Sequence, residues 1–325
     1  MHLYDCPSGV PQGSNLGPYL FLMFVADVHE YLGSSCCLLY ADDLKLYRAI
    51  NGNRDQMLLQ QDLNKLTEWS HRNKLTLSIE KCCKMTFTRA PQPIRTTYSI
   101  GGEILESHDK MRDLGVILQK DLSFMEQIRK VSATAKRNMG IVMRHSKLFT
   151  GAGTTRTLYF ALVRSNLDFG NVIWSSLGDE RSKSLERIQK RLLKYLYSKD
   201  FGYYETDITY KELVLGYELT TLKERRDLTL LLFLRDLVMS KIDSVQLLEK
   251  ITFHVPPRTS REKTGLFRTP RCRTAQFQTA PLNRIQKLYN TVEKIDATID
   301  IFFDSRAKYT SKILSAIRVL HNQQA

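Results

Sequence analysis

The chain has 325 residues, of which 42% are hydrophobic and 25% are charged, and its formal net charge is +14. This length and composition fit a globular protein of two or three domains, and no internal repeat or low-complexity tract interrupts the sequence. The excess of basic residues predicts a polyanionic partner, with nucleic acid favoured over an anionic membrane surface.

The sequence lacks the features of secreted and membrane proteins. Its six cysteines include two vicinal pairs but no C-x-x-C motif with partner histidines, which argues against a zinc site and a disulfide framework. The N-terminal residues do not resemble a signal peptide, and the longest apolar stretch, residues 19–26, is far shorter than the ~18 residues of a membrane span. We therefore expect an intracellular protein without a transmembrane segment, in which residues 19–26 form a buried helix.

A loop rich in glycine and proline precedes that helix. Residues 8–18 read SGVPQGSNLGP and contain three glycines and two prolines, so their backbone can approach a ligand closely. Pro18 suits the first turn of the helix that follows.

Two adjacent carboxylates, Asp42 and Asp43, lie in the stretch LLYADDLKLY. The apolar run over residues 36–40 predicts a buried strand, and the alternating run over residues 44–47 predicts its half-buried partner, with both aspartates in the connecting turn. Aspartate is common in turns, so an inert, exposed hairpin is the simplest interpretation of this pair alone. A divalent cation such as Mg²⁺ would also relieve the repulsion between two such carboxylates.

Together, these two stretches resemble two signatures of reverse transcriptases. GVPQGSNLGP followed by YLFLMF resembles motif B, and LLYADDLKLY resembles the catalytic motif C, most closely in non-LTR (LINE-type, jockey-like) retrotransposon polymerases. The resemblance implies an α+β fold: a partial right-hand polymerase palm, with an antiparallel sheet and helices, followed by a mainly helical thumb and C-terminal region. It also implies an RNA template, a DNA primer and dNTP as partners, Mg²⁺ or Mn²⁺ as cofactor, and a nuclear location.

The resemblance assigns roles to single residues. Asp42 would be the metal ligand shared by both ions, and Asp43 the accessory ligand. The stretch KLTLSIEKCCKMTF is similar to motif D, where a lysine follows a short strand, so Lys81 would protonate or orient the pyrophosphate. Without the family, Lys81 is an ordinary solvated lysine. The substrate-binding residues would be Pro11, Gln12, Gly13 and Tyr40.

Hydrophobic periodicity predicts the remaining elements of the first part of the chain. Residues 54–71 carry a helical apolar stripe, and residues 75–79 and 85–88 alternate as strands do. Residues 98–105 form a hairpin, because their central Gly-Gly supplies the positive φ angles of a primed turn. Residues 113–118 form a further strand.

The pattern becomes helical after residue 122. Ser123 and Glu126 have the spacing of a capping box at the start of a helix. Further helical patterns follow, and the sequence here is also similar to the region after the palm in these polymerases. The predicted helices cover residues 155–167, 182–198 and 222–239, and two more begin at Pro281 and Asp304.

The helix over residues 182–198 is strongly basic. Between residues 181 and 199 there are seven basic residues and one acid, Glu186, while Leu185, Ile188 and Leu192 belong to its apolar stripe. Such a face is either merely solvated or contacts a phosphate backbone, and the charge imbalance favours nucleic acid. The predicted nucleic-acid-binding residues are Lys183, Arg187, Lys190, Arg191 and Lys194.

These patterns divide the chain into a partial palm (1–120), a helical thumb (121–200) and a helical C-terminal region (201–325) with a basic loop at 256–274. In the family, an aspartate of motif A precedes the motif B loop, and only eight residues precede Gly9 here. We therefore expect a C-terminal portion of a reverse transcriptase that does not extend a primer by itself. The alternative is a non-catalytic nucleic-acid-binding remnant of a decayed element.

Overall fold

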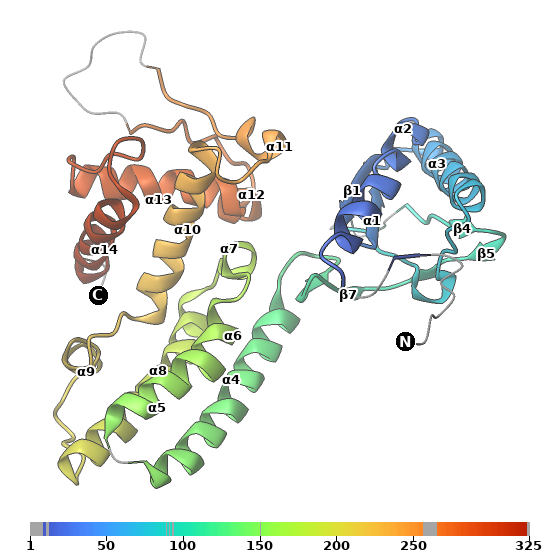
Figure 1. The fold of residues 1–325 in the computed structure, drawn as a ribbon. Helices are drawn as coiled ribbons and strands as arrows, with labels where there is room; N and C mark the ends of the chain where they lie inside the picture. The colour runs from blue at the N-terminus through green and yellow to red at the C-terminus, as the bar shows by residue number, and fades with distance from the viewer. Residues whose placement is uncertain are drawn as a thin grey trace. The chain divides into compact units, whose positions relative to one another are not determined.

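The computed structural model describes residues 9–10, 13–88, 90, 92, 94–149, 151–255 and 265–323 (Figure 1). The chain separates into two compact units, Met1–Ser123 and Phe124–Ala325. Helices predominate and the sheets are small, which confirms the prediction of a mixed α+β protein.

The first unit contains three helices, α1 (Gly17–Val25), α2 (Val28–Tyr31) and α3 (Asn53–Arg72). Helix α3 confirms the helix predicted over residues 54–71, and its Leu63, Leu66 and Trp69 are buried. Trp69 packs in one cluster with Val25, and its Nε1–H donates to the Asp27 carboxylate at 3.0 Å. The buried stripe of α3 therefore holds α1 and α2 in place.

Helix α1 is mostly exposed, so the prediction of a buried helix is wrong. It begins at the predicted Gly-Pro step, but only Gly17 and Val25 are buried, and Leu20 and Met23 are 50% and 76% exposed. An apolar run is buried only where another segment covers it. Among the described residues, the core of this unit covers little of α1 beyond Val25 and the half-buried Phe21.

The described strands form four separate two-stranded sheets, whereas the resemblance implied one partial antiparallel palm sheet. Three pairs are antiparallel, and the pair β3–β6 is parallel. The pairs are β1 (Cys36–Tyr40) with β2 (Asp43–Tyr47), β3 (Cys83–Lys84) with β6 (Glu106–Ser107), β4 (Ser99–Ile100) with β5 (Glu103–Ile104), and β7 (Lys110–Asp113) with β8 (Val116–Gln119).

Two predicted strands, over residues 75–79 and 85–88, do not form. Residues 75–78 and 85–88 are irregular, and a 3₁₀ turn spans Ile79–Lys81. Leu75 and Leu77 pack against the cluster that contains Trp69. Alternation gives a segment two faces, but it does not supply the partner strand that a ladder needs.

The two later predictions of β-structure have different outcomes. The Gly-Gly hairpin is confirmed, because β4 and β5 pair around Gly101 and Gly102, whose φ angles are +58° and +89°. The strand predicted over residues 113–118 is confirmed in part. Residues 116–118 lie in β8, whereas Leu114 and Gly115, at φ +43° and +90°, form the turn that joins it to β7.

The described part of the second unit is mainly helical, which confirms the three helices predicted over residues 155–167, 182–198 and 222–239. A π-helical segment, Phe160–Arg164, joins α5 to α6. The helices are α4 (Met125–His145), α5 (Ala152–Tyr159), α6 (Ser165–Asp168), α7 (Asn171–Trp174), α8 (Asp179–Phe201), α9 (Tyr210–Gly216), α10 (Leu222–Val238), α11 (Val245–Leu248), α12 (Ala275–Thr279), α13 (Pro281–Ile295) and α14 (Arg306–Gln323).

The start of α10 agrees with the prediction, whereas α5 and α8 each begin three residues earlier than predicted, at Ala152 and Asp179. The N-cap of α4 is Phe124, which has φ +53° and makes no side-chain cap hydrogen bond, so the predicted capping box at Ser123 is wrong. Pro281 begins α13 as predicted, whereas α14 begins at Arg306, two residues after the predicted Asp304.

The largest core of the second unit lies among α10, α13 and α14 (Figure 1). Phe267 joins this core at 2% exposure, and its ring meets Tyr289 edge-on at 5.1 Å. The second half of the predicted basic loop is therefore anchored to the core. Residues 256–264 of that loop lie outside the described residues.

Candidate functional site

The tip of the β1–β2 hairpin is a two-residue turn made by Ala41 and Asp42. Tyr40 pairs with Asp43, so Asp43 is the first residue of β2, which corrects the prediction that placed both aspartates in the turn. Ala41 has φ +52°, in the left-handed region, which costs a residue with a Cβ roughly 1–2 kcal/mol. Backbone strain of this kind is concentrated at functional sites. Here it sets the direction in which Asp42 leaves the hairpin.

The two faces of this hairpin have different surroundings. Leu44 and Leu46 are half-buried against the two clusters formed around α3. Tyr40 and Asp43 lie on the opposite, open face, where Tyr40 is 65% exposed. Strand β1 is therefore largely exposed, contrary to the prediction of a buried strand, because β2 is its single partner among the described strands. The side chains of both aspartates are exposed.

The base of the hairpin is held by Asp62, a buried residue of α3 that sequence analysis missed. Its carboxylate accepts hydrogen bonds from the backbone N–H groups of Gly33, Ser34 and Ser35 at 2.8, 3.1 and 2.8 Å, directly before β1. Burial by itself would raise the pKa of Asp62, but the hydrogen bonds from Ser35, Gly33 and Ser34 outweigh it and lower this pKa to about 2. A charged Asp62 therefore fixes the start of β1.

A second contact holds β2 from the open face. Lys45 Nζ forms an ion pair with Asp113 Oδ1 at 2.6 Å, which ties β2 to the end of β7. Neither this pair nor the Asp62 cluster produces a sequence motif, because the partners are far apart along the chain.

The hairpin can supply part of a metal site. Mg²⁺ commonly takes one or two protein carboxylates and completes its shell with water and substrate phosphates, so an exposed Asp42 and Asp43 fit this donor set. Within the described residues, no group of three or more histidine, cysteine or acidic side chains is arranged to hold a metal ion. A two-ion site therefore requires a ligand beyond those described.

The other predicted site residues are only partly described. Pro11 and Gln12 lie outside the described residues, and Gly13 has φ +82° in an exposed turn. Lys81 ends the 3₁₀ turn with its side chain exposed. Among the residues described, no hydrogen bond or ion pair connects Gly13 or Lys81 to Asp42.

The five predicted nucleic-acid-binding residues are all exposed on α8, and we call them the basic face. They are Lys183, Arg187, Lys190, Arg191 and Lys194. Four of them, at 183, 187, 190 and 194, are spaced by three or four residues and so follow one line along the helix. The predicted apolar stripe is confirmed, because Leu185, Ile188, Leu192 and Leu196 are buried at 1%, 4%, 0% and 0% exposure.

Glu186 does not neutralise the basic face, because it is engaged at the start of α10. Its carboxylate accepts hydrogen bonds from the backbone N–H groups of Leu222 and Lys223 at 3.1 and 2.7 Å and from the Tyr210 hydroxyl at 2.6 Å. Lys199 is likewise engaged, since its Nζ donates to the Ser146 carbonyl at 2.7 Å. The exposed charged side chains of α8 between 181 and 199 are therefore all basic, and Arg187 also forms an ion pair at 3.8 Å with the exposed Glu180 in the first turn of the helix.

Residues 4–118 match the family described as reverse transcriptase (RNA-dependent DNA polymerase). The match includes the β1–β2 hairpin with Asp42 and Asp43.

Curated relatives place the chain near jockey-like non-LTR retrotransposon polymerases. It is 24% identical over 205 residues to a probable RNA-directed DNA polymerase from transposon X-element of Drosophila melanogaster, covering 59% of this chain and 22% of the relative. It is 27% identical over 210 residues to a probable RNA-directed DNA polymerase from transposon BS of the same species, covering 61% of this chain and 23% of the relative. It is 32% identical over 129 residues to the RNA-directed DNA polymerase from mobile element jockey of Drosophila funebris, covering 37% of this chain and 14% of the relative. No solved structure matches.

The apolar segments of the described chain are short. No helix within it combines the length and the hydropathy that crossing a bilayer requires.

Proposed function

We propose that this chain carries part of the palm of an RNA-directed DNA polymerase, with Asp42 as the central metal ligand for nucleotidyl transfer. The strained Ala41–Asp42 turn carries this proposal, because it presents a carboxylate to solvent within the segment that matches the reverse transcriptase family. Asp43, on the open face beside Tyr40, is the accessory ligand. By the same resemblance, the protein acts in the nucleus.

The chemistry is an in-line displacement at phosphorus. Bound Mg²⁺ or Mn²⁺ would activate the primer 3′ oxygen and stabilise the charge on the leaving pyrophosphate. The residues of the chain then position the reactants. Asp42 and Asp43 hold the metal, Gly13 with the adjoining Pro11 and Gln12 contacts the nucleotide and template, and the exposed Tyr40 ring contacts the substrate. Lys81 protonates or orients the pyrophosphate.

Two carboxylates complete only part of a two-ion site, so we propose that a further carboxylate comes from outside the described residues. Primer extension on an RNA template with Mg²⁺ or Mn²⁺ compares the 325-residue chain with a longer chain that adds the motif A segment of a jockey-like polymerase. We expect synthesis by the longer chain. In that longer chain, Asp42→Ala should lower extension by roughly 10³-fold or more, as removal of other central catalytic groups does. Asp43→Ala should lower it less.

Asp109→Ala serves as the matched control, because Asp109 is an exposed carboxylate of the same unit and pairs only with Lys120 among the described residues. It should leave extension unchanged. Synthesis by the 325-residue chain that is lost in Asp42→Ala would place the third ligand within this chain. Equal synthesis by the longer chain and its Asp42→Ala variant would contradict the role of Asp42.

A second candidate function is nucleic-acid binding without catalysis, and the basic face of α8 favours it. In a longer chain of this kind, RNA–DNA hybrid binding would persist while extension stays at background in both wild type and Asp42→Ala. Extension that depends on Asp42 rejects this second function.

A further inference from the structure

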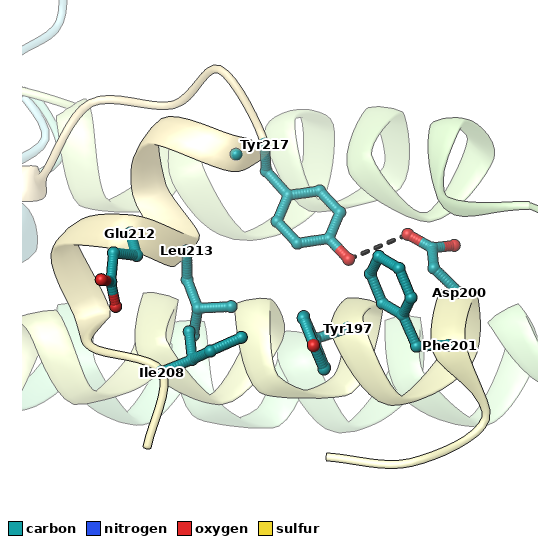
Figure 2. Close-up of a pocket in the computed structure, with 8 residues that line it drawn as sticks. Tyr197, Asp200, Phe201, Ile208, Glu212, Leu213 and Tyr217 are labelled. Carbon is teal, nitrogen blue, oxygen red and sulfur yellow. Dashed lines mark hydrogen bonds between the residues drawn. The ribbon is translucent and has the colours of Figure 1, made fainter. Parts of the chain in front are cut away.

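A pocket of about 290 Å³ lies at the C-terminal end of α8, between that helix and α9 (Figure 2). The rings of Tyr197, Phe201 and Tyr217 line it together with the aliphatic side chains of Ile208 and Leu213. The Tyr197 and Phe201 ring centroids are 4.5 Å apart, and Phe201 is 58% exposed. The pocket therefore offers flat apolar surfaces that a ligand can reach.

Two carboxylates, Asp200 and Glu212, line this pocket, and each has one oxygen available to a ligand. Asp200 accepts a hydrogen bond from the Tyr217 hydroxyl at 2.8 Å, the dashed line in Figure 2. Burial and this hydrogen bond raise the pKa of Tyr217, so the hydroxyl stays a donor. Asp200 Oδ1 accepts no hydrogen bond from any described residue. Glu212 lies on α9, where its Oε2 accepts from the backbone N–H and the hydroxyl of Thr209 at 2.7 and 2.8 Å, and its Oε1 likewise accepts no hydrogen bond from any described residue.

The pocket continues the line of the basic face. Lys183, Arg187, Lys190 and Lys194 follow one line on α8, and the same spacing of three and four residues next reaches Tyr197 and then Phe201. Residues three and four apart are neighbours on a helix surface. The exposed side of α8 therefore changes along a single line from ammonium and guanidinium groups to aromatic rings.

The basic part of this line suits the phosphate groups of a nucleic acid, and the aromatic part suits its bases. Basic side chains follow the backbone of a single strand, while aromatic rings stack on its bases. Small-molecule pockets typically measure roughly 300–1,000 Å³, so this pocket of about 290 Å³ suits one ring system. A carboxylate in such a pocket pairs best with adjacent N–H donors, which guanine presents on its Watson–Crick edge as N1–H and N2–H₂.

We propose that the pocket between α8 and α9 binds one unpaired base of a single-stranded nucleic acid, preferably guanine, whose flanking phosphates lie on the basic face. The inference rests on the proposed nucleic-acid interface of α8 and adds to it a base-binding site. Phe201 and Tyr197 would stack on the base, and Asp200 would accept its N–H groups. A cationic side chain of a peptide is the other ligand that aromatic rings with a carboxylate could take. The basic residues beside the pocket disfavour it.

The test measures binding of the full 325-residue chain to fluorescent ten-nucleotide DNA probes by anisotropy. All probes carry the same number of phosphates and the same abasic spacers at every other position, and they differ at one internal position, which carries guanine, hypoxanthine (inosine), adenine or no base. We expect the guanine probe to bind about 5- to 140-fold more tightly than the abasic probe, the range for stacking one base. Inosine, which lacks the N2 amino group, should fall between them.

Variants separate the base pocket from the phosphate contacts. Phe201→Ala should abolish most of the advantage of guanine over the abasic probe without changing the salt dependence of binding. Asp200→Asn should reduce the preference for guanine over adenine, and its amide oxygen can still accept from Tyr217. Phe303→Ala is the matched control, because Phe303 is 89% exposed and does not line the pocket. Gly216→Leu, at a lining position where an added Cβ meets open space, should weaken guanine binding without deleting a side chain.

Equal binding of the guanine and abasic probes by the wild type would overturn the base pocket. The proposed interface would stand in that case if glutamine substitutions in the basic face still reduce the salt dependence. If those substitutions change nothing, the interface itself fails. With no difference between guanine and abasic probes, direct binding of N-acetyl-trimethyllysine amide to the wild type but not to Phe201→Ala, measured by calorimetry, would assign the pocket to a cationic peptide side chain.

Discussion

Ala41 illustrates how one backbone angle shapes the candidate site. A glycine would hold φ +52° without the steric cost that a Cβ adds, so Ala41→Gly should raise the free energy of unfolding of the first unit by about 1 kcal/mol. Urea denaturation measures this change. Ala49→Gly is the control, because Ala49 has no positive φ and glycine there should be neutral or destabilising. A lower free energy of unfolding in Ala41→Gly would contradict the assignment of backbone strain to Ala41.

Asp62 links pH to the stability of the hairpin that carries the aspartates. Its side chain is 2% exposed, and three backbone N–H groups depend on its charge. Asp62→Asn should lower the free energy of unfolding at pH 7 by roughly 2–3 kcal/mol, because an amide offers these donors a weaker acceptor.

The pH dependence of this contribution has a definite sign. The pKa of Asp62 is lowered in the folded state to about 2, below its usual value of 3.8, so the contribution is complete above about pH 4 and is lost as pH falls toward 2. Urea titrations between pH 7 and pH 2 should show the stabilities of the wild type and Asp62→Asn converging. If the difference in free energy of unfolding between the wild type and Asp62→Asn stays constant over this range, the charge of Asp62 does not supply the stabilisation.

At the scale of the element, α8 has two sides with separate tasks. Its apolar side is buried, and Glu186 supports α10, so the basic face can change without loss of the core. Replacing Lys190, Arg191 and Lys194 by glutamine should reduce the slope of log K against log salt by roughly 2 to 3 units, because each cation lost releases one fewer counterion.

The matched control replaces three exposed lysines on other parts of the second unit, Lys241, Lys250 and Lys294, by glutamine. It removes the same charge and should leave the slope nearly unchanged. Equal effects of the two triple variants would mean that net charge, and not the basic face, sets the binding.

At the scale of the whole molecule, the second unit has its own cores. One hydrophobic cluster of this unit consists of buried residues from α10, α13 and α14, and a second cluster joins α8 to α9. Residues 124–325 expressed alone should therefore fold cooperatively as a mainly helical protein. Circular dichroism with thermal melting tests this expectation, and a broad, non-cooperative melt would contradict it.

The sequence by itself determined the features that depend on local patterns. The β1–β2 hairpin with its two aspartates, the Gly101–Gly102 turn and the helices α3, α8 and α10 follow from periods of two and 3.6 residues and from turn residues. The resemblance to reverse transcriptases rests on the same short motifs, and the family match over residues 4–118 confirms it.

Only the tertiary structure decided which surfaces are covered and which charges are free. The apolar α1 is exposed, Asp62 fixes the start of β1, and Glu186 leaves the basic face to reach the start of α10. Tyr197 and Tyr217 line one pocket although they belong to different segments. Each of these results depends on contacts between segments far apart in sequence. Hydrophobic periodicity specifies the faces of an element, but it does not specify the partner that meets each face.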